Sequence, residues 1–404
     1  MRKHFADFVR VKDLNADNRE RISSLGVDVS IFDDCCILPG FTDVHVHLRE
    51  PGFLYKETMR TGTAAAAAGG FTDVFSMPNL NPCPDNAENL RVQLDAIKRD
   101  ALVNVYPYGA ITVGEAGKVI AELEAVADNV IAFTDDGKGV SSDVLMLEAM
   151  QRAKALGKPV VAHCEDERYP REAPEAEWKQ LERDIELVRR TGCSYHVCHI
   201  STEEAAGLVR KAKEEGLDVT CETAPHYLTI SDETTEDDGR FKMNPPIKFE
   251  KDRQALLRAL KDGTIDMIAT DHAPHSAEEK NKGFDGSAFG IIGMETAFPV
   301  LYTELVDKGI ISLKKLTELL YDNPRKRFGL EVSTLEEELA KEKPAFALWD
   351  LNEEYDIDPG KFLSMGRSTP FDGWRAMGRC RLTVASGRVI QEYKDERHWI
   401  YDNK

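Results

Sequence analysis

Short β-branched runs alternate with longer segments of helical periodicity between residues 37 and 309, and few folds accommodate such an alternation. It predicts parallel strands joined by crossover helices. Eight runs are predicted to be strands, at 36–48, 71–79, 103–112, 130–137, 159–167, 195–201, 218–228 and 266–275. Helical segments lie between them, among them 56–68, 86–100, 142–157 and 251–263, and several end in a glycine that can close a helix. Eight such units predict an α/β fold of the (β/α)8 TIM-barrel type.

The two flanks differ from this pattern. Residues 1–39, and the chain from about residue 340, carry strand patterns without intervening helices, as in "AFALWDL" and "CRLTVASGRVIQEY". They are expected to pair into a small β unit beside the barrel. The sequence therefore predicts an N-terminal flank at 1–39, a metal-dependent hydrolase barrel at 40–339 and a C-terminal flank at 340–404.

Charge and composition exclude several classes of protein. The formal net charge of −19 repels polyanions, which argues against binding to nucleic acid or to anionic membranes. No run approaches the roughly 18 apolar residues that a membrane span needs. The polar start "MRKHFADFVR" lacks the apolar core of a secretory signal, so the expected location is the cytoplasm.

The eight cysteines form no CxxC motif and do not describe a disulfide framework. We expect them to be mostly reduced thiols in the core. The alternative is metal binding by Cys35 with Cys36, or by Cys193 with Cys198.

Two histidines alternate with valine in the first predicted strand. Successive side chains of a strand point to opposite faces, so His45 and His47 share one face while Val44 and Val46 share the other. Two imidazoles on one face inside a barrel can hold a single cation. The alternative is a pair of hydrogen-bonded core histidines.

Polar residues at other strand ends converge with this pair. Asp136, His163, His199 and Asp271 each lie at or just beyond the carboxyl end of a predicted strand, where barrels build their active sites. Together with His45 they give imidazole and carboxylate ligands that suit zinc or a similar divalent ion.

Several motifs resemble those of the dihydroorotase family in the amidohydrolase superfamily. The strongest are "DVHVHLREPG" and "ATDHAPH". Further matches are "YKET" at 55–58, "GGFT" at 69–72, "MPN" at 77–79, "FTDDG" at 133–137, "AHCED" at 162–166, "HVCHIS" at 196–201, "KMNPP" at 242–246 and "FGIIGMETAFP" at 289–299. The similarity covers about residues 38–330. The stretch "RYPREAPEAEW" after Glu167 is shorter than the insertion expected in this family, and the N-terminal flank lacks the usual glycine-punctuated strands.

The resemblance implies a zinc-dependent barrel enzyme that reversibly converts N-carbamoyl-L-aspartate to L-dihydroorotate in pyrimidine biosynthesis, with one or two ions per chain. It implies these metal ligands: His45, His47, Asp136, His163, His199 and Asp271. It implies these substrate contacts: Arg49, Asn79, Asn244 and His275. It also makes a homodimer the expected assembly.

The chemistry of the expected reaction assigns roles to two residues. A bound zinc lowers the pKa of water to about 7 and so supplies a nucleophile for opening the ring. Asp271 is placed to take the proton of the attacking water and pass it to the departing ring nitrogen; its alternative role is that of a metal ligand or strand cap. The planar guanidinium of Arg49 suits the substrate carboxylate, and its alternative is a surface salt bridge with Glu50.

The end of the fourth strand carries an aspartate where hydantoinase-like relatives carry a lysine that becomes carboxylated. Asp136 matches the family, and an unmodified carboxylate can bridge two ions. Asp135 is the local competitor, with a cap of the next turn as its alternative role. Lys138 lies beyond a glycine and is expected to be a solvated loop residue.

Two other functions fit parts of the pattern. Allantoinase and dihydropyrimidinase share the barrel and the HxH start, but neither explains Arg49 within "HLREPG". The chain could instead be a catalytically silent subunit that supports aspartate transcarbamoylase. Silent relatives usually lose metal ligands, whereas all six matched positions are filled here.

Overall fold

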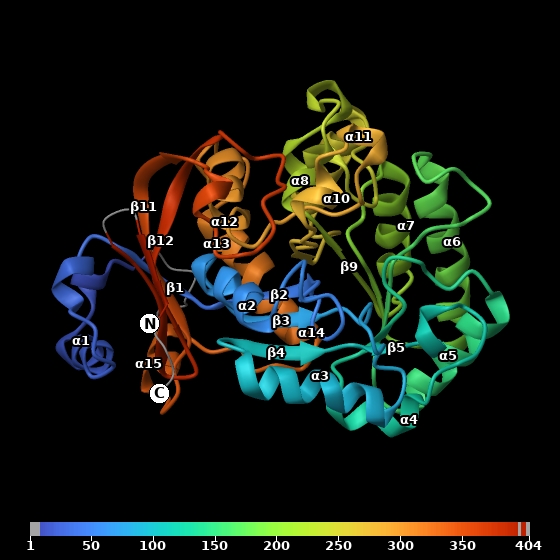
Figure 1. The fold of residues 1–404 in the computed structure, drawn as a ribbon, viewed down its shortest axis with the longest axis horizontal. Helices are drawn as coiled ribbons and strands as arrows, with labels where there is room; N and C mark the ends of the chain where they lie inside the picture. The colour runs from blue at the N-terminus through green and yellow to red at the C-terminus, as the bar shows by residue number, and fades with distance from the viewer. Residues whose placement is uncertain (1–8, 395–396, 401–404) are drawn as a thin grey trace.

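The computed structural model describes residues 9–394 and 397–400, which form a parallel barrel with an antiparallel sheet beside it (Figure 1). Every predicted strand run contributes to the barrel. Its strands are β2 (Phe41–Val46), β3 (Phe71–Ser76), β4 (Asn104–Pro107) with β5 (Gly109–Ala110), β6 (Phe133–Thr134), β7 (Val160–Ala162), β8 (Tyr195–Val197), β9 (Val219–Thr223) and β10 (Met267–Ile268). β4 and β5 are two halves of the third barrel strand. The predicted (β/α)8 barrel is therefore confirmed.

The barrel closes between its first and last strands. All its strand pairs are parallel, in the order β2-β3-β4 and β5-β6-β7-β8-β9-β10. A parallel bridge joins Val46 to His272, and the His47 amide donates to the His272 carbonyl at 2.8 Å. The carboxyl end of β2 is thus held beside the chain that leaves β10.

Helices cover the outside of the barrel and link its strands. The long ones are α2 (Met59–Ala68), α3 (Ala87–Asp100), α5 (Asp143–Ala155), α6 (Pro174–Thr191), α7 (Glu203–Glu214) and α9 (Glu250–Asp262). The shorter ones are α4 (Leu123–Val126), α8 (Pro225–Thr229), α10 (Ala277–Lys280), α11 (Gly283–Gly286), α12 (Ala297–Leu301), α13 (Leu313–Thr317) and α14 (Asn323–Arg327). Asn86 caps α3 by accepting from the Asn89 amide, and Gly192 ends α6 in the left-handed conformation at φ 64°.

The first predicted strand run is split between the two sheets. Its first part forms β1 (Cys36–Pro39), which pairs with β11 in the flanking sheet, and its second part forms β2 of the barrel. Gly40 lies between them, where a Cβ atom would overlap the side chain of Thr72. Only glycine permits this close passage from one sheet to the other.

The flanking sheet has the order β1-β11-β12-β13-β14 and is antiparallel. Its other strands are β11 (Phe346–Asp356), β12 (Arg375–Ala385), β13 (Arg388–Lys394) and β14 (Arg397–Ile400). The predicted β unit is confirmed. The expectation that its flanks lack helices is wrong, because α1 (Ala16–Ser23) lies in the N-terminal flank, capped by the Asn15 side chain. The acidic run at 333–343 contains the helix α15 (Leu335–Ala340).

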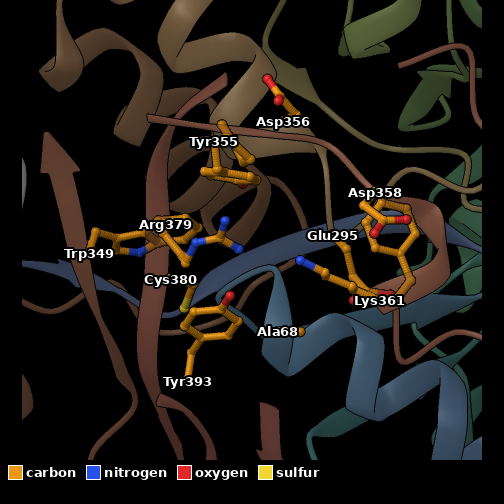
Figure 2. A pocket seen from close by; sticks show the side chains of 12 residues that line it. Ala68, Glu295, Trp349, Tyr355, Asp356, Asp358, Lys361, Arg379, Cys380 and Tyr393 are labelled. Atoms are coloured by element: carbon orange, nitrogen blue, oxygen red, sulfur yellow. The ribbon is translucent and has the colours of Figure 1, made fainter. Parts of the chain in front are cut away.

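Aromatic packing joins the sheet to the barrel. Trp349 of β11 lies 4.1 Å from Phe298 and 5.8 Å from Phe41 between ring centroids, and all three rings are buried. A small cavity of about 50 Å³ remains at this junction (Figure 2). Figure 2 shows Arg379 against Tyr355, whose ring centroid is 3.5 Å from the guanidinium carbon. Among the described residues, none of the groups with metal-ligating geometry lies here.

The cysteines are unpaired throughout the part of the chain that the structure describes. All eight are free thiols; seven are buried and Cys83 is half-buried. This confirms the prediction of reduced thiols, mostly in the core. Cys35, Cys36 and Cys193 belong to no group with metal-ligating geometry, whereas Cys198 lies in one with His45 and Glu222. No helix in residues 9–394 and 397–400 is both long and apolar enough to cross a membrane.

Candidate active site

The six predicted metal ligands converge at the carboxyl ends of the barrel strands. His45 Nε2 lies 3.3 Å from Asp136 Oδ1 and 3.4 Å from Asp271 Oδ1. His47 Nε2 lies 3.4 Å from Asp136 Oδ2 and 3.1 Å from Asp271 Oδ1. The remaining two are His163 and His199, and His163 Nδ1 lies 3.0 Å from His199 Nε2 and 3.8 Å from Asp136 Oδ1. Six side chains from five strand ends therefore meet around one point.

Asp136 belongs to two sets of residues that could each hold an ion. Three groups here offer ligand atoms that all lie within 4.8 Å of one another: His45, His47 and Asp136; Asp136, His163 and His199; and His45, His199 and Asp271. The first two groups share Asp136 and no other residue. A carboxylate has two oxygens, so this arrangement suits a bridge between two cations.

Buried atoms without partners show that the six side chains do not satisfy one another. His45 Nε2 and Asp136 Oδ1 are buried and have no hydrogen-bond partner. Leaving such atoms unpaired is costly in a protein interior, and a cation among them would remove that cost. The residues therefore fit a metal centre better than a hydrogen-bonded core, which was the alternative interpretation of the HxH pair.

Both aspartates are held as carboxylates. Burial alone would raise the pKa of Asp136, but His45 and His199 beside it hold that pKa well below its usual range. Burial opposes ionisation of Asp271 in the same way, and its pKa is nevertheless lowered to about 2 by His45 and His47. Each group is thus an anionic ligand at neutral pH.

Three of the histidines are oriented by acceptors on the far side of the ring. His45 Nδ1 lies 2.8 Å from Glu222 Oε1, and His47 Nδ1 lies 2.8 Å from Asn79 Oδ1. Since those nitrogens carry the proton that is donated, the Nε2 atoms of both rings present lone pairs to the centre. In His163 the order is reversed, because Nε2 lies 3.0 Å from Glu165 Oε2 and Nδ1 faces the site.

Strained backbone is concentrated at the same place. Arg49, His199 and Asp271 have positive φ values of 61°, 29° and 49°, although none is glycine. This conformation is unfavourable for residues with side chains and persists only where surrounding contacts impose it. The strain places these three side chains toward the site.

A cavity of about 200 Å³ opens directly above the metal-ligand groups. All four predicted substrate contacts line it: Arg49, Asn79, Asn244 and His275. Arg49 Nε donates to the Pro274 carbonyl at 3.2 Å, and Arg49 Nη2 lies 3.4 Å from His275 Nε2. Burial and the charges of Arg49 and Lys56 lower the pKa of His275 to about 3, so its imidazole is neutral.

The comparisons with known proteins agree with this geometry. Residues 35–173 match the family described as dihydro-orotase-like. The dihydroorotase of Anoxybacillus flavithermus is 45% identical over 397 residues, which cover 94% of this chain and 90% of the relative. That of Fusobacterium nucleatum is 44% identical over 412 residues and covers 96% of both chains.

The chain belongs to the dihydroorotase family.

Solved structures place this dihydroorotase family member within a wider group. An L-hydantoinase (dihydropyrimidinase) from Arthrobacter aurescens superposes with a TM-score of 0.79 and 25% identity over 88% of this chain and 85% of the other. A dihydropyrimidinase from Brevibacillus agri gives 0.78 over 90% and 86% of the two chains, at 22% identity, which shows the shared fold. The chain is a metal-dependent cyclic amidohydrolase of the TIM-barrel class.

The residues beside Asp136 differ in role from it. Lys138 is exposed in the loop, as predicted. Asp135 accepts from the amides of Ile111 at 2.8 Å and Thr112 at 3.0 Å. The expectation that its side chain caps the next turn is therefore wrong in its partner, because it ties the third barrel strand to the fourth. Only Asp136 faces the metal-ligand groups.

Sequence reasoning missed three polar residues of the site. Glu165 and Glu222 orient His163 and His45, and Arg171 lines the cavity. Glu165 follows a predicted strand end by the rule that selected His163, so its position alone could have indicated it. Nothing local identifies Glu222 or Arg171, because their partners lie on other strands and loops.

Proposed function

We propose that this chain catalyses the zinc-dependent, reversible conversion of N-carbamoyl-L-aspartate to L-dihydroorotate, a step of pyrimidine biosynthesis. The observation that carries the proposal is the pair of ligand groups sharing Asp136, directly beneath a cavity that contains Arg49. Full-length dihydroorotase relatives at 44–45% identity support the same reaction.

Zinc suits the nitrogen and oxygen ligands of the site. His45 and His47 would hold one ion with Asp136, and His163 and His199 a second, with Asp136 shared. Zinc bound there would lower the pKa of water and polarise the ring carbonyl, which is the chemistry that opening a cyclic amide needs.

Asp271 is proposed as the proton carrier. Its carboxylate is ionised, lies 3.1 Å from His47 Nε2 and lines the substrate cavity, so it is both near the metal-ligand groups and accessible to substrate. In the ring-opening direction it would accept the proton of the attacking water and deliver it to the ring nitrogen as the C–N bond breaks. In the biosynthetic direction the same carboxylate would take that proton back.

Substrate recognition is assigned to Arg49, with three neutral neighbours. The Arg49 guanidinium would bind the carboxylate that both substrates carry. Asn79 uses its oxygen for His47, which leaves its amide nitrogen as a donor. Asn244 is the proposed contact on the opposite wall, where its nitrogen donates to Glu165 Oε2 at 2.7 Å.

The decisive experiment is a substrate comparison on the purified protein with its metal content measured in parallel. Ring opening would be assayed on dihydroorotate, allantoin and dihydrouracil. The proposal expects turnover of dihydroorotate, loss of turnover after chelation and recovery with zinc. Preferential turnover of allantoin or dihydrouracil would reassign the substrate, and a metal-binding protein without activity would favour a silent subunit.

Two proposals concern the environment of the enzyme. We infer a homodimer that is active without another protein; light scattering on the purified chain tests the first part and its specific activity the second. Activity that appears only on adding aspartate transcarbamoylase would show that a partner is needed. The cytoplasmic location stays a prediction.

A further inference from the structure

A second guanidinium lines the cavity on the side opposite Arg49. Arg171 follows β7, the fifth barrel strand, whereas Arg49 follows β2, the first. In a closed barrel of eight strands these two positions face each other across the mouth. A molecule that fills the cavity therefore has one arginine at each end.

The contacts of Arg171 leave most of its guanidinium available. Its Nε donates to Glu165 Oε1 at 2.7 Å, and its guanidinium carbon lies 4.7 Å from the centroid of the Phe289 ring. Among the described residues, its two terminal amino groups have no hydrogen-bond acceptor. The side chain is 37% exposed, so it is fixed at one nitrogen and open to the cavity at the others.

Glu165 does not use up this positive charge in a simple surface pair. Its other oxygen accepts from Asn244 and faces His163 Nε2, so Glu165 serves the site on one side and orients Arg171 on the other. Arg168, three residues earlier, is different. It is 77% exposed, pairs with Asp166 at 2.6 Å and lines a separate hollow.

The two ends of the proposed reaction differ in charge, and the inference rests on that proposed function. Hydrolysis adds the oxygen of water to the ring carbonyl carbon, breaks the C–N bond, moves one proton to the nitrogen and releases another. Dihydroorotate carries one carboxylate and carbamoyl aspartate two. Arg49 is assigned to the carboxylate that both molecules share.

We propose that Arg171 binds the carboxylate that exists only in the open-chain substrate, and so distinguishes N-carbamoyl-L-aspartate from the cyclic form. Its free amino groups match a carboxylate's two oxygens, and Phe289 holds the guanidinium plane over the cavity. Arg171 is thus a specificity residue within the loop that follows the fifth strand.

The test is the division between KM and kcat in Arg171→Gln, measured on the zinc-loaded enzyme in both directions. The overall equilibrium is independent of the enzyme, so kcat/KM must fall by the same factor in each direction, about tenfold for one charge-assisted contact. With carbamoyl aspartate the loss should appear in KM, because the contact exists in the bound ground state. With dihydroorotate it should appear in kcat, with KM unchanged, because the contact forms only as the ring opens.

Two matched variants complete the experiment. Arg168→Gln removes a neighbouring arginine that lies outside the cavity and should leave all four kinetic constants unchanged. Arg171→Lys keeps the charge but loses the planar fork, and should recover part of the affinity for carbamoyl aspartate. Equal rises in KM for both substrates, or loss of metal from Arg171→Gln, would make Arg171 a structural partner of Glu165 and overturn the proposal. If the wild-type enzyme fails to turn over dihydroorotate, the proposed function itself has failed.

Discussion

Replacing Glu222 with glutamine tests whether the barrel interior tunes the metal centre. Glu222 is buried in β9 and uses both oxygens: Oε1 accepts from His45 Nδ1 at 2.8 Å, and Oε2 lies 3.0 Å from His196 Nε2. Burial alone would raise the pKa of Glu222, but the bonds from His196 and His45 overcome it and lower the pKa to about 2. The group is therefore a carboxylate that orients His45 through a charge-assisted bond.

The size of the effect follows from these two bonds. Glutamine keeps the shape but turns one acceptor oxygen into an NH2 donor, so Glu222→Gln can satisfy only one of the two histidines. A hydrogen bond to a charged group contributes about 1.5–3 kcal/mol, and each 1.4 kcal/mol is about tenfold in affinity. We therefore expect metal to bind about 10- to 100-fold more weakly, the range seen when groups behind metal ligands are removed.

The assay is competition for zinc against a chromophoric chelator, with ions per chain counted by elemental analysis. Glu338→Gln is the matched control, because Glu338 is also a buried glutamate, but it accepts from the Ala345 amide at 2.8 Å and pairs with Lys341 in the flank. The control should bind zinc like the wild type. Affinity within about twofold of wild type in Glu222→Gln would refute the reasoning.

Three further predictions test the other assignments. His45→Ala or His163→Ala should lose metal and activity together, and full activity with unchanged metal content would contradict the ligand set. Arg49→Lys should raise the KM for dihydroorotate about tenfold, since a point charge cannot reproduce two parallel bonds, and an unchanged KM would place carboxylate binding elsewhere. Asp136→Ala should lose at least one ion, whereas Lys138→Ala keeps its metal and activity ignores added bicarbonate; a carboxylated Lys138 detected by mass would overturn the bridging role of Asp136.

The fold was predictable because periodicity is local information. Each barrel strand is a short buried run followed by a helical segment, and both patterns can be recognised within a dozen residues. The N-terminal flank was not predictable in the same way. Helix α1 carries few apolar residues and only Ile22 is buried, so no apolar stripe marked it in the sequence.

The ligand set was predictable for a related reason. In a parallel barrel, the position of a residue relative to its strand end determines which mouth it faces, so His163 and Asp271 could be placed without knowing their neighbours. Pairings across the barrel carry no such local sign. The partner of His45 lies 177 residues away, at Glu222, and the partner of Asp135 proved to be the preceding strand rather than the next turn.

The closure of the barrel and the arrangement of the site depend on the same contacts. Between β2 and β10 the backbone supplies one bridge, from Val46 to His272, and the rest of the seam is made by Asp43. The buried Asp43 carboxylate accepts from the amide of Thr270 at 3.1 Å, from its hydroxyl at 2.6 Å and from the amide of His45 at 3.1 Å. The seam lies directly below His45 and Asp271, so the bonds that close the barrel also determine the spacing of a ligand from the first strand and one from the last. A metal centre that needs both can therefore form only in the closed barrel.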